Sequence, residues 1–393
     1  MILAIGGLGG VLAARLLQPA GRGSLVAAVA YATVVTGISA LGVNQAAIYH
    51  SAREATKGSG LRCALRLALP QAIVADAALI AVGAGIVHNG DAMRCLSWYL
   101  LWPPSALTAG AVLSWYQGRG EWRHYNLANL LIASVNLIPI VLLGIAGAAT
   151  ATRTAALNNL LMLLVAGFLL RRALSEAGAR GPAIPYRTML GYGARAFPSV
   201  AGWLLLSRAD QLILAATVPS RDLGLYAAAL ALAALVLPFA GAFANLSFTR
   251  LASPAGTSHR NHLVTRTIFQ ATLVMGLVAL VIYVSTPLIV PALYGRSFLG
   301  TIDLARVLLL ASVPLGLTYI SADMLRGLGA PGLASIGTLV GALGTITCLA
   351  LLVPAHGAAG AAIASVFGYG IAAASMLVLL VGRMHSTKLS AEG

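Results

Sequence analysis

Acidic residues are scarce in this sequence, which has 10 Asp and Glu against 25 Lys and Arg in 393 residues. Charged residues of both signs make up only 9%, whereas an ordinary soluble domain carries about 25%. Hydrophobic residues make up 59%, and the mean hydropathy is +0.89. Because so few charges cannot cover a water-exposed surface, the composition excludes a soluble globular protein and indicates one that is solvated by lipid.

Cysteine and catalytic motifs are also scarce. The three cysteines, Cys63, Cys95 and Cys348, fall at the cytoplasmic end of one predicted span, at the opposite end of another and within a third, which excludes a disulfide framework and a CxxC metal site. The seven histidines form no HExxH motif, and no glycine-rich phosphate loop follows a strand. We therefore expect no enzyme, no cofactor and no metal site. The net charge of +15 is spread over short loops without interleaved aromatics, which indicates contact with anionic lipid headgroups and no nucleic acid.

Long apolar runs are what the sequence has in abundance. Residues 25–49 and 271–290, for example, are long enough to cross a bilayer and do not alternate with period two as barrel strands would. A window of about 19 residues yields twelve spans. They lie near 1–17, 24–49, 64–87, 93–117, 126–147, 155–172, 188–217, 223–248, 264–290, 304–326, 330–353 and 358–382. The sequence thus predicts an all-α polytopic membrane protein with about twelve transmembrane helices.

The placement of the basic residues predicts the orientation. With a cytoplasmic N-terminus, sixteen Lys and Arg fall in cytoplasmic loops and ends and seven on the other side, while Arg195 and Arg208 lie inside a span. By the positive-inside rule, both termini are therefore predicted in the cytoplasm of a bacterial inner membrane. Met1 opens onto apolar residues without a cationic flank, so we also expect a late start codon or a missing short cytoplasmic leader.

An internal repeat of about 200 to 210 residues is consistent with two sets of six spans. Residues 18–25 follow the first span much as 218–226 follow the seventh, and the fourth and tenth spans carry Pro104 and Pro314. Unless this similarity is chance among Ala- and Gly-rich helices, it predicts two six-helix lobes around a central cleft. The predicted divisions are an N-terminal lobe at 1–172, a cytoplasmic linker at 173–187, a C-terminal lobe at 188–383 and a cytoplasmic tail at 384–393.

Arginines in or beside the spans are candidates for substrate binding, because ionisable groups are costly in a bilayer. Arg195 and Arg208 lie about 20 Å apart along the seventh span, at 1.5 Å per residue, with Pro198 between them. Together with Arg15 they are candidates to bind an anionic phosphate, since guanidinium stays charged and suits phosphate geometry. Alternatively, Arg15 and Arg208 only reach to the membrane interface.

Carboxylates in the spans are candidates for ion coupling. Asp76, in the middle of the third span, either couples transport to H+ or Na+ or only hydrogen-bonds across helices. Asp210 lies two residues from Arg208, so the two side chains point to different faces of one helix and one needs a partner elsewhere. Alternatively, Asp210 caps the loop that follows. Asp323 and Arg326, three residues apart, are predicted to form an ion pair.

Short motifs along nearly the whole chain carry a family resemblance. They lie at 14–23, 41–49, 208–214, 224–226, 293–298, 326–329 and 353–362. In this order they resemble bacterial polysaccharide-biosynthesis flippases, the lipid-linked oligosaccharide translocases of the multidrug/oligosaccharidyl-lipid/polysaccharide (MOP) superfamily. The resemblance implies two lobes that alternate between inward-open and outward-open states, cations near the substrate phosphates and a cation gradient as driving force. Arg15, Arg22, Arg208 and Asp210 occupy matching motif positions, so Arg22 joins the phosphate-binding candidates.

The expected function is therefore to flip a lipid-linked (polyprenyl-pyrophosphate) oligosaccharide or polysaccharide precursor across the inner membrane by alternating access. The expected partners are membrane lipids, the lipid-linked glycan and other polysaccharide-assembly proteins. A cation-coupled multidrug antiporter of the same superfamily and a non-transporting membrane scaffold remain alternatives. A drug antiporter would be expected to use carboxylates and aromatics, whereas aromatics are only 6% of this sequence and its in-span charges lean to Arg.

Overall fold

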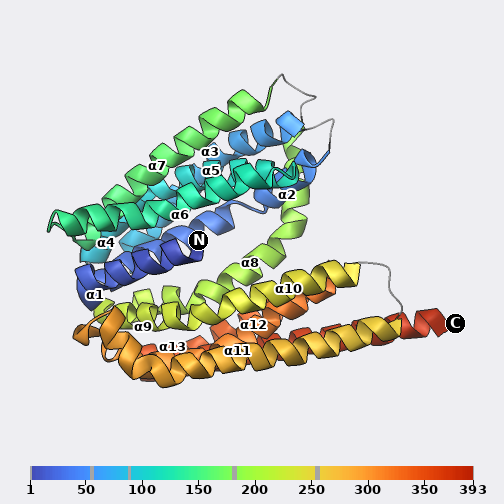
Figure 1. The fold of residues 1–393 in the computed structure, drawn as a ribbon. Helices are drawn as coiled ribbons and strands as arrows, with labels where there is room; N and C mark the ends of the chain where they lie inside the picture. Colours follow the sequence, from blue (N-terminus) through green and yellow to red (C-terminus); the bar gives the residue numbers. More distant parts are fainter. Residues whose placement is uncertain (1, 54–56, 87–89, 179–183, 253–256, 393) are drawn as a thin grey trace. The chain divides into compact units, whose positions relative to one another are not determined.

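The computed structural model describes residues 2–53, 57–86, 90–178, 184–252 and 257–392. Within these residues the chain is built of helices, with no strand (Figure 1). The α-helices are α1 (Ile2–Ser39), α2 (Val43–Ser51), α3 (Lys57–Ile86), α4 (Gly90–Trp98), α5 (Trp102–Gly118), α6 (Trp122–Ile145), α7 (Ala151–Glu176), α8 (Tyr186–Thr217), α9 (Ser220–Ala233), α10 (Leu237–Ala252), α11 (Thr257–Leu293), α12 (Thr301–Gly327) and α13 (Pro331–Glu392). Short 3-10 turns, η2 (Tyr99–Leu101), η3 (Ala234–Val236) and η4 (Arg296–Phe298), join α4 to α5, join α9 to α10 and precede α12.

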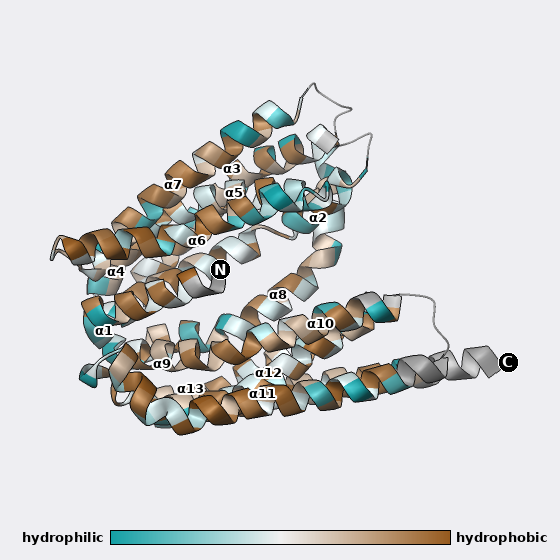
Figure 2. Cartoon of the chain, viewed as in Figure 1, coloured by the Kyte–Doolittle hydropathy of each residue, from teal (hydrophilic) through white to brown (hydrophobic). Residues whose placement is uncertain are grey.

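The helices have the length and polarity of membrane spans. In the described residues, eight helical stretches are long and apolar enough to cross a membrane. Two of them, Ile5–Ser39 and Pro331–Met384, each cover two predicted spans. Figure 2 shows hydrophobic residues along most of α6, α7 and α11, with hydrophilic residues mainly near the helix ends. The chain is thus an all-α multi-pass membrane protein, as the sequence predicts.

The long helices α1 and α13 are each interrupted at one residue. The backbone of Gln18 (φ 58, ψ 173) breaks α1, and that of Gly357 (φ 54, ψ −131) breaks α13. Helix resumes at Pro19, whose fixed φ suits a first helical position. Residues 18–23, expected as a loop between spans, are therefore helical after a single-residue break.

A further break separates α1 from α2 at residues 40–42, so the continuous span predicted over 24–49 is wrong at this point. Leu41 and Gly42 have positive φ values of 46 and 70. A Cβ atom on Gly42 would overlap the carbonyl oxygen of Gly193 on α8, so only glycine allows this close approach. The close packing of two backbones thus accounts for a break that hydropathy does not reveal.

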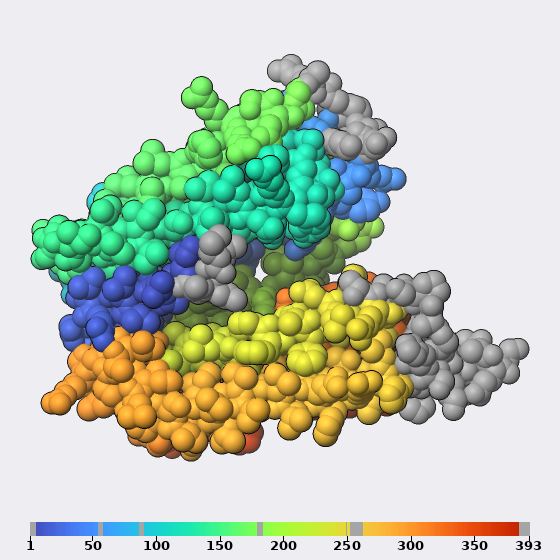
Figure 3. Space-filling view, viewed as in Figure 1, coloured from blue at the N-terminus to red at the C-terminus, as the bar shows by residue number. Residues whose placement is uncertain are grey.

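The chain divides into two compact units, of which the first contains Met1–Ala201 and Pro219–Gly224. At its centre lies α5, which contacts α2, α3, α6 and α7. Trp115 and Tyr116 of α5 are fully buried in the core with Leu61 of α3 and Met162 of α7. In the space-filling view, α6 and α7 pack side by side (Figure 3).

The second unit contains Gly202–Val218 and Leu225–Gly393, so α8 contributes to both units. Its central helix is α12, which contacts α10, α11 and α13. Leu206 of α8, Ala311 of α12 and Tyr369 of α13 share a buried core. The predicted linker at 173–187 includes residues 179–183, which lie outside the described residues, and the predicted lobe boundaries stay a prediction.

Candidate functional site

The richest cluster of buried polar groups surrounds Asp210 on α8. The side chain of Asp210 is 2% exposed. Its Oδ2 accepts a 2.6 Å hydrogen bond from the hydroxyl of Tyr226 on α9, and its Oδ1 accepts one of 2.7 Å from the backbone N–H of Gln211. The Tyr226 hydroxyl also lies 3.4 Å from Oγ of Ser365 on α13. This cluster joins three helices of the second unit.

Arg208 does not share the hydrogen bonds of Asp210. Its Nη1 donates a 3.0 Å hydrogen bond to Oε1 of Gln211, a neutral amide. Gln211 is 3% exposed, and its buried Nε2 has no hydrogen-bond partner in the described part of the chain. Arg208 and Gln211 together therefore offer a cation and an unused amide donor beside a carboxylate that Tyr226 already binds.

Sequence reasoning missed three buried residues, namely Tyr226 and Ser365 of this cluster and Tyr369, one turn after Ser365 on α13. Tyr226 lies in the motif at 224–226, where the sequence gives no reason to single out a tyrosine. The available signal was the need of Asp210 for a partner outside its own helix. Which residue is the partner of Asp210 depends on which helices are neighbours, and a single sequence does not show this.

Arg195 lies in the first third of α8, in the part that belongs to the first unit, and is exposed. Its Nε donates a 3.0 Å hydrogen bond to the carbonyl of Gly191, one turn earlier. Arg195 and Arg208 therefore each donate a hydrogen bond to another residue of α8.

Arg15 and Arg22 lie on opposite sides of the break in α1. Arg15 is exposed, and its carbonyl accepts a 3.1 Å hydrogen bond from Nε2 of Gln18. Arg22 is 6% exposed, and its Nη1 donates to the carbonyl of Gly10. The buried guanidinium therefore connects the two halves of the broken helix and holds the bend at Gln18.

The two segments that the sequence aligns as repeats meet within the first unit. A Cβ atom on Gly23 would overlap the carbonyl of Ser220, and one on Gly224 would overlap the carbonyl of Pro19. Each segment thus presents a glycine to the carbonyl found four residues before the glycine of the other. Such a reciprocal pattern is typical of contacts between equivalent segments.

Asp76 is half-buried on α3, and its Oδ1 is buried with no hydrogen-bond partner among the described residues. Nearby, Nε2 of Gln71 donates a 3.1 Å hydrogen bond to the carbonyl of Ala40. Asp76 follows Gln71 by a little over one helical turn, and Thr36, whose buried hydroxyl also has no partner in the described residues, precedes Ala40 by about one turn. A carboxylate oxygen in this state can accept a proton or ligate a cation.

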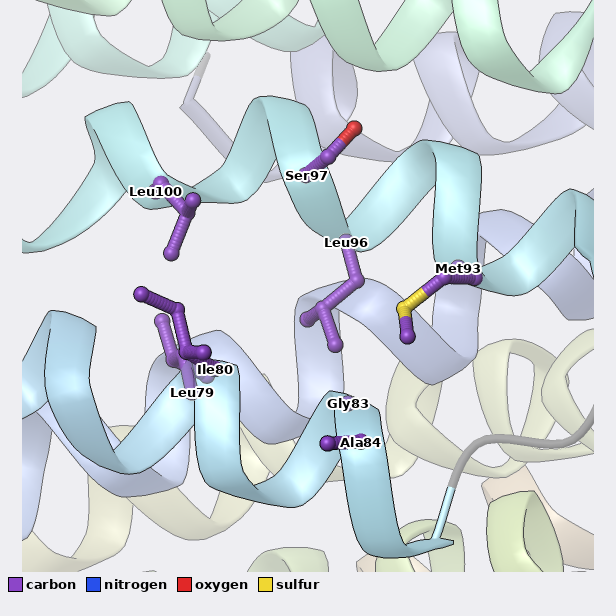
Figure 4. Close-up of a pocket in the computed structure, with 8 residues that line it drawn as sticks. All are labelled: Leu79, Ile80, Gly83, Ala84, Met93, Leu96, Ser97 and Leu100. Atoms are coloured by element: carbon purple, nitrogen blue, oxygen red, sulfur yellow. The ribbon is translucent and has the colours of Figure 1, made fainter.

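Two pockets among the described residues are apolar and contain none of the candidate residues. One, of about 210 Å³, lies between α3 and α4 and is lined by Leu79, Ile80, Gly83, Ala84, Met93, Leu96, Ser97 and Leu100 (Figure 4). The Ser97 hydroxyl turns away to the carbonyl of Arg94. The other, of about 600 Å³, lies between α11 and α12, with Tyr283 as its one hydroxyl-bearing residue. Neither offers cationic side chains to a phosphate.

The fold is shared with solved membrane transporters. The lipid II flippase MurJ in an inward closed conformation has a TM-score of 0.79 at 12% identity, covering 99% of this chain and 88% of that chain. An inward-facing multidrug resistance MATE family transporter of the MOP superfamily has a TM-score of 0.77 at 16% identity, covering 99% and 96%. A MOP superfamily transporter from Pyrococcus furiosus has a TM-score of 0.65 at 14% identity, covering 98% and 94%.

These likenesses establish the fold of the chain as that of MOP superfamily transporters, and they confirm the fold that the sequence resemblance implies. No protein-family profile and no curated protein sequence matches the chain.

Proposed function

We propose that this protein is a transporter that flips a lipid-linked oligosaccharide or polysaccharide precursor, carried on a polyprenyl pyrophosphate, by alternating access. The observation that carries the proposal is the arrangement at Arg208. Its guanidinium is half-buried and bonded to a neutral amide, while Asp210 binds Tyr226. The unused Nε2 donor of Gln211 adds a second group that suits an anion. A pyrophosphate is a ligand that a guanidinium and an amide donor bind well.

The fold supports the same proposal, because a lipid II flippase is among its structural neighbours. Arg195, Arg15 and Arg22 remain proposed phosphate-binding residues. The hydrogen bond from Arg22 to Gly10 gives it a structural role in addition. We place the protein in the bacterial inner membrane, with both termini in the cytoplasm and with polysaccharide-assembly proteins as partners.

Asp76 is the proposed coupling residue for H+ or Na+. Its Oδ1 is buried without a hydrogen bond in the described residues, whereas both oxygens of Asp210 accept one. Ionisable groups inside membrane helices commonly serve such relays. Asp76→Asn should therefore abolish transport driven by the ion gradient.

Deletion of the gene tests the proposal in the cell. The expected result is loss of surface polysaccharide together with accumulation of lipid-linked intermediates in the inner leaflet. Complementation with Arg208→Ala, Arg195→Ala or Asp76→Asn should fail to restore export, whereas Arg153→Gln, a change at an exposed arginine on α7, should restore it. Normal export in all three site variants would refute the proposed site residues. Normal export in the deletion strain would refute the proposed function.

A cation-coupled multidrug antiporter is the second candidate, because MATE transporters share the fold at a TM-score of 0.77. It predicts drug sensitivity as the phenotype of the deletion strain, with unchanged surface polysaccharide. The arginine at position 208 argues against it, since a cationic drug would be repelled there.

A further inference from the structure

Three potential metal ligands converge where α6 begins and α7 ends, in the first unit. Glu121 and His124 stand at the start of α6, and Glu176 is the last residue of α7. One ligand atom from each residue lies within 4.8 Å of the other two. The two helices pack side by side (Figures 1 and 3). The cluster lies outside the in-span sites described above.

The separation between His124 and Glu121 fits ligands of one metal ion. Nδ1 of His124 lies 3.3 Å from Oε2 of Glu121. Two ligands at 2.0 to 2.2 Å from a tetrahedral zinc ion are about 3.4 Å apart. Glu121 is the N-cap residue of α6 and His124 lies in its first turn, and the same Glu-x-x-His spacing occurs in metal sites of helical bundles. Glu176 supplies the third ligand from the neighbouring helix.

The surrounding side chains hold both carboxylates in place. Arg119 binds Oε1 of Glu121 at 2.7 Å, which leaves Oε2 directed to His124. Arg172 Nε donates to Oε1 of Glu176 at 2.8 Å, and the Tyr116 hydroxyl donates to its Oε2 at 3.1 Å. Such outer partners orient the ligands of a metal, and each carboxylate oxygen keeps a lone pair for the ion.

The aromatic wall and the solvent access of the cluster also suit a metal site. The buried Tyr116 ring lies 5.3 Å from the His124 ring, centroid to centroid, and limits its rotation. The side chains of Glu121 and His124 are 27% and 34% exposed, so an ion can enter from water and keep a water as its fourth ligand.

We propose that Glu121, His124 and Glu176 bind one divalent transition-metal ion of the zinc class and so fasten the start of α6 to the end of α7. The imidazole ligand selects Zn2+ over Mg2+ and Ca2+, which prefer oxygen ligands. The ion takes the lone pair of Nδ1 in the neutral tautomer of His124 whose proton is on Nε2, so that no proton has to leave the imidazole. Arg119 and Arg172 already balance the negative charges of Glu121 and Glu176. A bound ion therefore leaves the cluster with a net positive charge, and we expect a moderate affinity for Zn2+.

Zinc titration of the full-length purified protein, with its affinity tag removed, tests the site. Calorimetry should give one Zn2+ per chain, and Co2+ in its place should produce the visible absorption of a tetrahedral complex. His124→Ala and Glu121→Gln should each weaken Zn2+ binding by about 100-fold. The controls His356→Ala and Asp303→Asn, at exposed positions elsewhere, should leave it unchanged.

Thermal unfolding distinguishes a lost ligand from a damaged fold. Without metal, Glu121→Gln should unfold close to the wild-type temperature, and only the wild type and the two controls should gain stability when Zn2+ is added. Absence of zinc binding to the wild type would overturn the proposal, and so would equal binding by His124→Ala. Either result would show that the cluster is only a set of ion pairs between helices.

Discussion

The hydroxyl of Tyr226 donates a 2.6 Å hydrogen bond to Oδ2 of Asp210, and both side chains are buried between α8 and α9. A buried carboxylate without such a donor is strongly destabilising, because it loses its hydration without compensation. The bond also directs the carboxylate to Tyr226, so that the hydrogen bond of Arg208 goes to Gln211 instead. Tyr226 thus supplies a hydrogen bond to the buried carboxylate of Asp210 from outside the helix that carries it.

Replacement of this tyrosine gives the first prediction. Tyr226→Phe should lower stability by about 1 to 3 kcal/mol, since it removes the donor to a buried carboxylate and leaves the ring in place. The measurement is the melting temperature of the purified protein in detergent. Combined with Asp210→Asn, the two losses should be less than additive, because one variant removes and the other weakens the same charge-assisted bond. Strict additivity would mean that the two groups do not interact.

The close approach of Gly224 to Pro19 gives the second prediction. Gly224→Ala should destabilise the protein by about 1 to 3 kcal/mol, because the added Cβ would overlap a backbone carbonyl that cannot rotate away. Gly7→Ala is the matched control, since Gly7 is also helical and has open space around it. Yields of folded protein on size exclusion, with melting temperatures, should separate the two. Equal yields and melting temperatures of Gly224→Ala and Gly7→Ala would show that the two segments can move apart to accommodate the added Cβ atom.

The strained backbone at Gln18 gives the third prediction. Its φ of 58 and ψ of 173 lie in a region that is nearly exclusive to glycine and costs about 1 to 3 kcal/mol. Gln18→Gly should therefore raise stability by up to about 1 kcal/mol, even after the entropy cost of glycine. Ala20→Gly, in regular helix two residues later, should lower it by about 1 kcal/mol. If both variants are destabilised alike, the break is not strained.

The helical fold was predictable from the sequence, because a bilayer forces apolar runs of span length to become helices. The breaks were less accessible. Pro19 marks the restart of α1, but nothing in the sequence marks Leu41, whose positive φ depends on Gly42 packing against Gly193. Hydropathy averages over many residues and does not detect an interruption of one or two.

The site was predictable only in its charged members. Asp210 and Arg208 are identified by the cost of charge in a membrane. Tyr226 and Ser365 are not, since a tyrosine and a serine are ordinary residues in an apolar helix, and their importance comes from facing Asp210. Likewise, Glu176 joins Glu121 and His124 only because α6 and α7 are neighbours, and so the sequence gives no reason to expect a metal there.

The side chain at position 208 gives the fourth prediction. Arg208→Gln should reduce transport of an anionic lipid-linked substrate by about 10-fold or more, since a charge-assisted hydrogen bond contributes about 1.5 to 3 kcal/mol. Arg208→Lys keeps the charge without the fork and should retain part of the activity. The melting temperatures of both variants should stay near that of the wild type, because the hydrogen bond of the Arg208 side chain goes to a neutral amide.

The most direct test of the central claim is a flipping assay in liposomes that contain the purified protein and a labelled polyprenyl-pyrophosphate oligosaccharide. The rate at which the sugar becomes accessible on the opposite face is measured with and without an ion gradient. The account predicts protein-dependent flipping that Arg208→Gln strongly reduces and Arg153→Gln does not. Flipping no faster than in protein-free liposomes, together with gradient-driven export of a cationic drug, would contradict it.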